Sequence, residues 1–130
     1  MNQFIEELKI EHGKIIGFFN TIEASEKFND QKNLVKELTA LVVIHLKKED
    51  EQLYPKLALS KNEEISKMGS IFSMAMKNNS KDFVAFVERF LSSTEPNSEL
   101  MDTYKMISGK IRDRITIEET VLYPAYEQSI

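Results

Sequence analysis

The segment His45–Pro55, HLKKEDEQLYP, has a near copy at Arg114–Pro124, RITIEETVLYP. Both copies carry a glutamate at their fifth position, Glu49 or Glu118, and both end in Leu-Tyr-Pro. Only the first copy pairs a histidine with this glutamate, because the second begins with arginine. Residues at i and i+4 share one face of a helix, where a histidine and a glutamate can hold a metal ion. The repeat therefore predicts two related helices, one of which has lost half of a ligand pair.

Apolar residues recur every three or four positions on either side of this repeat, which is typical of amphipathic helices. The first helix is expected to run from Phe4 to about Lys27, and Asn29-Asp30 to form a turn with an N-cap. The second is expected to end near Tyr54-Pro55, since the residue before proline is disfavoured in the α conformation.

The rest of the chain predicts two more helices. Asn62 is expected to cap the third. Its middle, Asn78–Asp82, is rich in weak helix formers, so two shorter helices are an alternative to one long helix, which we favour. Ser92–Ser98 is expected to be a loop, followed by a helix from Leu100 to Ala125. Four amphipathic helices with short loops predict an all-α, antiparallel up-down four-helix bundle, formed as a single domain by residues 1–130.

Composition narrows the function classes. The 130-residue chain has a net charge of −4 with both signs interspersed, so it has no basic patch and we expect no nucleic-acid partner. It contains no cysteine, which excludes disulfides and thiolate metal sites and fits a reducing compartment. Neither a signal-peptide core nor a membrane-spanning apolar run is present in the sequence. We therefore expect a cytoplasmic protein without a membrane partner.

Five polar residues interrupt the apolar faces near the middle of the predicted helices. In an up-down bundle they should converge at one depth, and buried carboxylates there require positive charge. Two sources remain open. One is a metal ion bound by two histidines and two glutamates, a set that suits iron, manganese or zinc. The other is the arginine together with a protonated histidine. The five residues are His12, His45, Glu49, Arg114 and Glu118.

Neighbouring polar residues are expected to have no chemical role. Glu11 is expected on the solvated face of its helix, and Tyr54 and Tyr123 are expected to pack at helix ends. The sequence shows no nucleophile beside a general base, so an enzyme is the least favoured class.

These motifs resemble the hemerythrin-like, or HHE cation-binding, family over essentially the whole chain. The resemblance rests on Glu11-His12, on the H-x-x-x-E of His45–Glu49 followed by Leu-Tyr-Pro, and on the E-x-x-x-L-Y-P of Glu118–Pro124. The resemblance implies a four-helix bundle with a non-haem di-iron centre, usually held by five histidines and two bridging carboxylates. Members bind or sense oxygen, or are linked to nitric oxide response, iron handling or iron–sulfur repair.

This chain has only two histidines and cannot supply that full set. The resemblance implies that every ligand of one iron is retained, and that the three histidines of the other iron are replaced. The retained ligands would be His12, His45, Glu49 and Glu118, and the vacated second position would be occupied by Phe72, Met76 and Arg114.

Two hypotheses follow from this pattern. In the first, the protein binds one non-haem metal ion, with iron favoured over zinc or manganese, and Arg114 places its positive charge in the vacated half. Such a site leaves room for water or for a small diatomic ligand such as oxygen or nitric oxide. In the second, no metal is bound, and an Arg114–Glu49–Glu118 network holds the core of a regulatory or protein-interaction module. Either form is expected to be a monomer or a homodimer.

Overall fold

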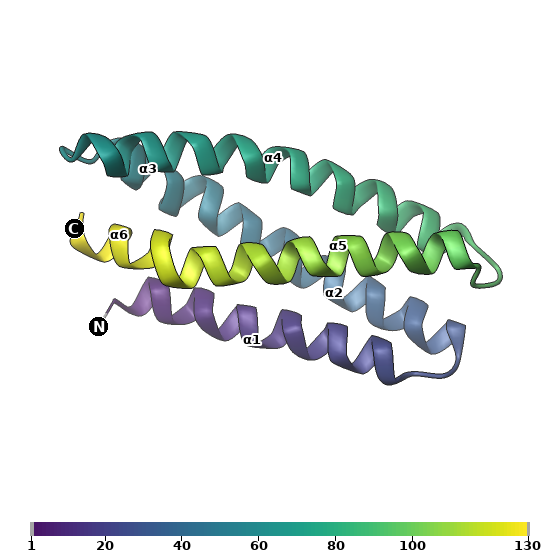
Figure 1. Cartoon of the computed structure of the whole chain (residues 1–130). Helices are drawn as coiled ribbons and strands as arrows, with labels where there is room; N and C mark the ends of the chain where they lie inside the picture. The colour runs from purple at the N-terminus through teal and green to yellow at the C-terminus, as the bar shows by residue number, and fades with distance from the viewer. Residues whose placement is uncertain (1, 130) are drawn as a thin grey trace.

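The protein is an antiparallel up-down four-helix bundle, as predicted (Figure 1). The computed structural model describes residues 2–129, and no strand is formed among them. The second and fourth columns of the bundle are each extended by a π-helical turn and a short helix. The columns are α1 (Gln3–Ala24); α2 (Phe28–Lys48) with η1 (Glu49–Leu53) and α3 (Tyr54–Ala58); α4 (Glu63–Ser92); and α5 (Ser98–Ile117) with η2 (Glu118–Leu122) and α6 (Tyr123–Gln128).

The first loop lies earlier in the chain than predicted. Helix α1 ends at Ala24 rather than near Lys27, and α2 begins at Phe28, before the expected Asn29-Asp30 turn. The Phe28 ring packs 5.0 Å from that of Phe90, and this apolar contact draws the start of α2 into the bundle. The prediction of an Asn-Asp turn was therefore wrong by a few residues.

The third column confirms two predictions. Asn62 caps α4, since its Oδ1 accepts a hydrogen bond from the Glu64 backbone N–H at 2.9 Å. Helix α4 is one continuous helix through Asn78–Asp82 rather than two shorter ones. The following loop, which the sequence predicts, ends at the N-cap Asn97.

The prediction that the second helix ends near Tyr54-Pro55 was wrong. A π-helical turn carries the column onward, with the Tyr54 N–H donating to the Glu49 carbonyl oxygen. The wider turn accommodates Pro55, which has no N–H to donate and would clash with the carbonyl four residues back in a regular α-helix. The same arrangement recurs in η2, where the Tyr123 N–H donates to the Glu118 carbonyl.

The π turn also changes which side chains face the core. In a regular α-helix, residues five apart point about 140° away from each other around the axis. A π turn brings them closer to alignment. Glu49 and Tyr54 are accordingly both buried, and so are Glu118 and Tyr123. Each repeat therefore presents a glutamate and a tyrosine to the same interior.

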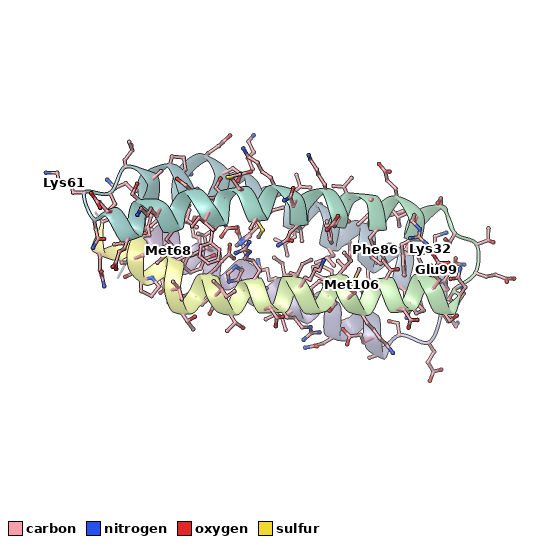
Figure 2. All side chains as sticks on the ribbon, turned by 45° about the horizontal axis from the view of Figure 1, so that its top comes forward. Lys32, Lys61, Met68, Phe86, Glu99 and Met106 are labelled. Carbon is pink, nitrogen blue, oxygen red and sulfur yellow. The ribbon has the colours of Figure 1, made fainter. Side chains whose placement is uncertain are left out.

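The core consists of two apolar halves with a polar layer between them. One half lies toward the chain termini and includes Leu8 and Leu57, with Met68 packed against it. The other lies toward the opposite end and includes Phe19 and Phe86. Met68 and Phe86 are labelled in Figure 2. No helix within residues 2–129 has the length and apolar character needed to cross a membrane.

Candidate metal centre

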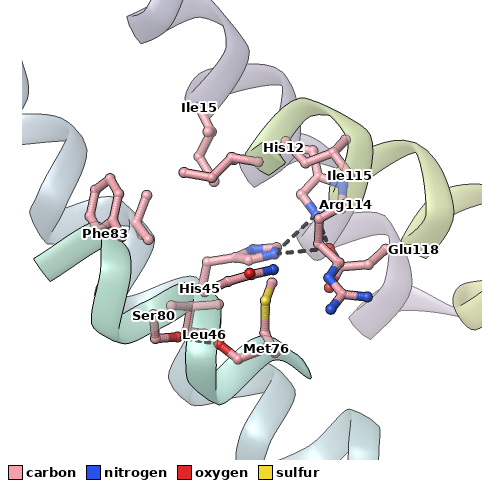
Figure 3. Close-up of a pocket in the computed structure, with 13 residues that line it drawn as sticks. His12, Ile15, His45, Leu46, Met76, Ser80, Phe83, Arg114, Ile115 and Glu118 are labelled. Atoms are coloured by element: carbon pink, nitrogen blue, oxygen red, sulfur yellow. Dashed lines mark hydrogen bonds and ion pairs between the residues drawn. The ribbon is translucent and has the colours of Figure 1, made fainter. Parts of the chain in front are cut away.

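Four buried side chains meet in the polar layer. His12 comes from α1, His45 from α2, Glu49 from η1 and Glu118 from η2. Each offers one ligand atom, and all four atoms lie within 4.8 Å of one another. The structure therefore brings together the four residues that the sequence singled out as candidate ligands, three of which are labelled in Figure 3.

The two histidines face each other through the same ring nitrogen. Their Nε2 atoms are 3.0 Å apart. Each Nδ1 is occupied by a carboxylate, Glu119 for His12 at 2.7 Å and Glu11 for His45 at 2.8 Å. A carboxylate that accepts the Nδ1 proton leaves the Nε2 lone pair pointing into the site, as in carboxylate–histidine–metal triads. Two such lone pairs repel each other unless a proton or a metal ion lies between them.

The two glutamates complete the cluster. Glu118 Oε1 lies 2.9 Å from His12 Nε2, and Glu49 Oε1 lies 3.4 Å from His45 Nε2. Glu49 Oε1 is fully buried and has no hydrogen-bond partner within residues 2–129. A buried carboxylate oxygen without a donor is costly, and a cation would satisfy it.

Two tyrosines hold the outer oxygens of these carboxylates. The Tyr123 hydroxyl donates to Glu49 Oε2 at 3.0 Å and also lies 3.0 Å from His12 Nε2. The Tyr54 hydroxyl donates to Glu118 Oε2 at 3.3 Å. Their hydrogen bonds leave the inner oxygens of both glutamates directed at the histidines.

The pKa values of the buried groups are shifted in different directions. Burial and the neighbouring charge of Glu118 raise the pKa of Glu49 well above its usual range. Burial would also raise the pKa of Glu118, but hydrogen bonds from His12 and His45 outweigh it and lower this pKa. Burial opposes the charged form of His45, yet the adjacent Glu118 and Glu49 raise its pKa to about 10. Without metal, the site therefore retains protons at neutral pH.

The ligand atoms have spacings that fit one metal ion. Neighbouring ligands bound at about 2.1 Å lie roughly 3.0–3.4 Å apart in octahedral or tetrahedral arrangements. Two separations between histidine nitrogen and glutamate oxygen, 2.9 and 3.4 Å, are close to this range, and the third, between His45 and Glu118, is longer at 4.0 Å. Two imidazole nitrogens and two carboxylate oxygens suit iron, manganese or zinc. The residues present therefore fit a single ion of this class.

The residues predicted for a vacated second position also lie together. The Arg114 guanidinium carbon is 4.9 Å from the centre of the Phe72 ring, and Met76 borders the same cavity as Arg114 (Figure 3). Within residues 2–129, Arg114 forms no ion pair with Glu49 or Glu118. The arginine–glutamate network that the metal-free hypothesis requires is therefore not formed.

A cavity of about 40 Å³ adjoins the candidate ligands. His12, His45 and Glu118 line it, together with residues that include Arg114, Met76 and Phe83 (Figure 3). A single water needs about 10–15 Å³ by this measure, so the cavity has room for a molecule of a few atoms.

Sequence reasoning missed four residues of the site. Glu11 was expected on a solvated face, but it bonds to His45, and Tyr54 and Tyr123 were expected to have no chemical role, but they bond to the carboxylates. Glu119 lies in the second copy of the repeat and was assigned no role. Glu11 and Glu119 each adjoin a candidate ligand in the chain, and both tyrosines recur five residues after a glutamate, which are the signals that could have identified them.

Fold and site together define an all-α bundle with a buried histidine–glutamate cluster able to hold a metal. The family model described as "Hemerythrin HHE cation binding domain" matches residues 3–126 of the chain. The protein therefore belongs to the hemerythrin HHE cation-binding family. No curated protein and no solved structure matches the chain.

Proposed function

We propose that this protein binds one metal ion, iron, through His12, His45, Glu49 and Glu118, and that it senses or handles oxygen, nitric oxide or iron. The observation that supports this most directly is the pair of Nε2 atoms 3.0 Å apart, each backed by a carboxylate on Nδ1. Ring orientation by a carboxylate prepares a histidine to ligate, and the unpartnered Glu49 oxygen calls for a cation.

The residues at the vacated second position favour one bound ion over two. Phe72 and Met76 offer no nitrogen or oxygen ligand, and the Arg114 guanidinium would repel a second cation. Across residues 2–129, the His12–His45–Glu49–Glu118 cluster is the one group of three or more histidine, aspartate or glutamate side chains close enough to share an ion.

The chain's own residues determine how such a site would behave. Glu119 and Glu11 fix the two imidazole rings, and Tyr123 and Tyr54 fix the carboxylates. The apolar halves above and below exclude bulk water, while the adjoining cavity admits a small molecule. Bound iron would supply a redox couple and an open coordination position for such a molecule.

Metal analysis of protein purified from iron-replete cells without chelators tests the proposal. We expect about one equivalent of iron, lost in His45→Ala and retained in Glu127→Ala, whose exposed side chain lies outside the site. Two equivalents would contradict the single-ion site. A protein that contains no metal, and whose unfolding is unchanged by added iron, zinc or manganese, would contradict metal binding altogether.

A further inference from the structure

A groove lies on the outside of the bundle between α2 and α4. Val42 and Phe83 line it from below and are buried, and Leu46 packs partly buried beside them. Val43 on α2 and Val84 on α4 also line it, and these two side chains are 53% and 47% exposed. The groove has a volume of about 380 Å³ and presents a mostly apolar surface to the outside.

A second hollow continues this surface onto the outer side of α4. It has a volume of about 350 Å³ and shares Ser80 and Val84 with the groove. Its remaining lining residues are Lys81, Ala85 and Glu88. Single exposed apolar side chains are ordinary on a protein surface, but Val84 belongs to a contiguous apolar surface, which is typical of an interaction site.

The charged residues of this hollow have opposite signs and lack partners. Lys81 and Glu88 are both exposed, and neither forms an ion pair within residues 2–129. Their neighbours Asp82 and Arg89 are paired with residues of α5 instead. Lys81 and Glu88 are seven residues apart, which places them two turns, or about 10.5 Å, from each other along one side of the helix. A surface with this arrangement of charge is complementary to a copy of itself turned end to end.

We propose that this face binds a second copy of the chain, with the two α4 helices antiparallel about a twofold axis between Val84 and Ala85. Val84 and Ala85 lie midway between Lys81 and Glu88, so Lys81 of each copy is then level with Glu88 of the other. A twofold interface uses the same surface on both copies, and two identical ion pairs form. Each α4 also covers the partner's groove, where the exposed Val43 and Val84 side chains lose contact with water.

The size of this surface indicates a weak dimer. Each copy contributes one helix side and one groove, which belongs to the small end of protein interfaces. We expect a dissociation constant of about 1–100 μM, and a weaker dimer at high salt because the ion pairs lie at the edge of the apolar contact. None of the four candidate metal ligands lines the groove or the hollow, so dimerisation does not require a bound metal.

Sedimentation equilibrium of the full chain tests this inference. We expect Lys81→Glu and Glu88→Lys each to weaken the wild-type dimer about tenfold or more, because each change places like charges opposite one another twice. The double variant Lys81→Glu/Glu88→Lys restores both pairs with reversed polarity, and it should dimerise within a few-fold of the wild type. The inference is overturned if the wild type is monomeric at about 500 μM, well above the expected constant, or if the double variant is as weak as the single ones.

Cross-linking tests the position of the twofold axis. The chain contains no cysteine, so a single introduced cysteine reports proximity without background. Ala85→Cys should form a disulfide-linked dimer on mild oxidation with diamide, since residues beside a twofold axis between packed helices come within the span of a disulfide. Ile71→Cys is the matched control, because Ile71 is 64% exposed on α4 but lines neither the groove nor the hollow. It should cross-link at least about tenfold more slowly, and equal rates would overturn the proposed interface.

Discussion

Tyr123, from the second copy of the repeat, donates its hydroxyl to Glu49 of the first copy at 3.0 Å. The reverse contact also exists, since Tyr54 of the first copy donates to Glu118 of the second at 3.3 Å. Each copy thus supplies a carboxylate to the site and a hydroxyl that orients the other copy's carboxylate. The two copies of the repeat therefore build the site only together.

The shorter of these contacts should contribute measurably to stability. We expect Tyr123→Phe to lower the free energy of unfolding of metal-free protein by about 1–2 kcal/mol, because Glu49 loses its only hydroxyl donor in a buried site. Urea denaturation followed by circular dichroism measures this change. Tyr126→Phe is the control, as the Tyr126 ring packs against that of Phe4 in a tilted arrangement and its hydroxyl makes no hydrogen bond within residues 2–129. Equal effects in the two variants would refute the role assigned to Tyr123.

The carboxylates behind the histidines should control metal affinity. We expect Glu119→Ala and Glu11→Ala each to weaken zinc binding by about tenfold to a hundredfold, since the Nδ1 partners orient the rings and increase their basicity. Competition with a chromophoric chelator gives the affinities. Glu127→Ala removes an exposed acid of α6 and should leave them unchanged. Unaltered binding in both site variants would show that the rings are positioned by packing alone.

Metal affinity should rise with pH. The metal-free site retains a proton on His45, whose pKa is raised to about 10, and the pKa of Glu49 is also raised. Ligands bind metal in their deprotonated forms, so at neutral pH the ion must displace protons, and raising the pH reduces this competition. Calorimetry in buffers of different ionisation enthalpy should show the release of at least one proton per zinc ion between about pH 6 and 8. Binding without proton release would contradict the protonation state inferred for the site.

Two glycines on different helices should respond oppositely to alanine. A Cβ at Gly69 would lie 2.7 Å from Leu57 Cβ and 3.1 Å from the Ala58 backbone nitrogen, so Gly69→Ala must push α4 away from α3. We expect it to destabilise the protein by about 1–3 kcal/mol. Gly109→Ala meets nothing within 4 Å and should stabilise by up to about 1 kcal/mol through helix propensity. Thermal unfolding of both variants measures the contrast, and a loss of stability in Gly109→Ala would show that its site is less open than described.

Helical periodicity was enough to predict the bundle, because each apolar stripe is buried when its helix packs against the stripes of the other three helices. The candidate ligands could be predicted because they are polar residues within those apolar stripes. A polar side chain on a core face, such as that of His12 or Glu49, requires a partner. Periodicity was not enough to predict the π turns. Tyr-Pro normally marks a helix end, and only the packing of the tyrosines against the opposite carboxylates shows why the helix continues. The contacts of Glu11 and Glu119 with the histidines depend on how each helix is rotated about its axis. The apolar stripe does not define this rotation accurately enough to predict them.

The contact between His12 and Glu118 joins positions 106 residues apart. A metal ion bound to both would close most of the chain into a ring, as a disulfide between the first and last helix columns would. A cross-link of that loop length reduces the entropy of the unfolded chain by an amount worth roughly 4–5 kcal/mol at room temperature. Loading and removal of metal would then change the resistance of the whole bundle to unfolding and proteolysis, and the cell's metal supply would set the lifetime of the protein.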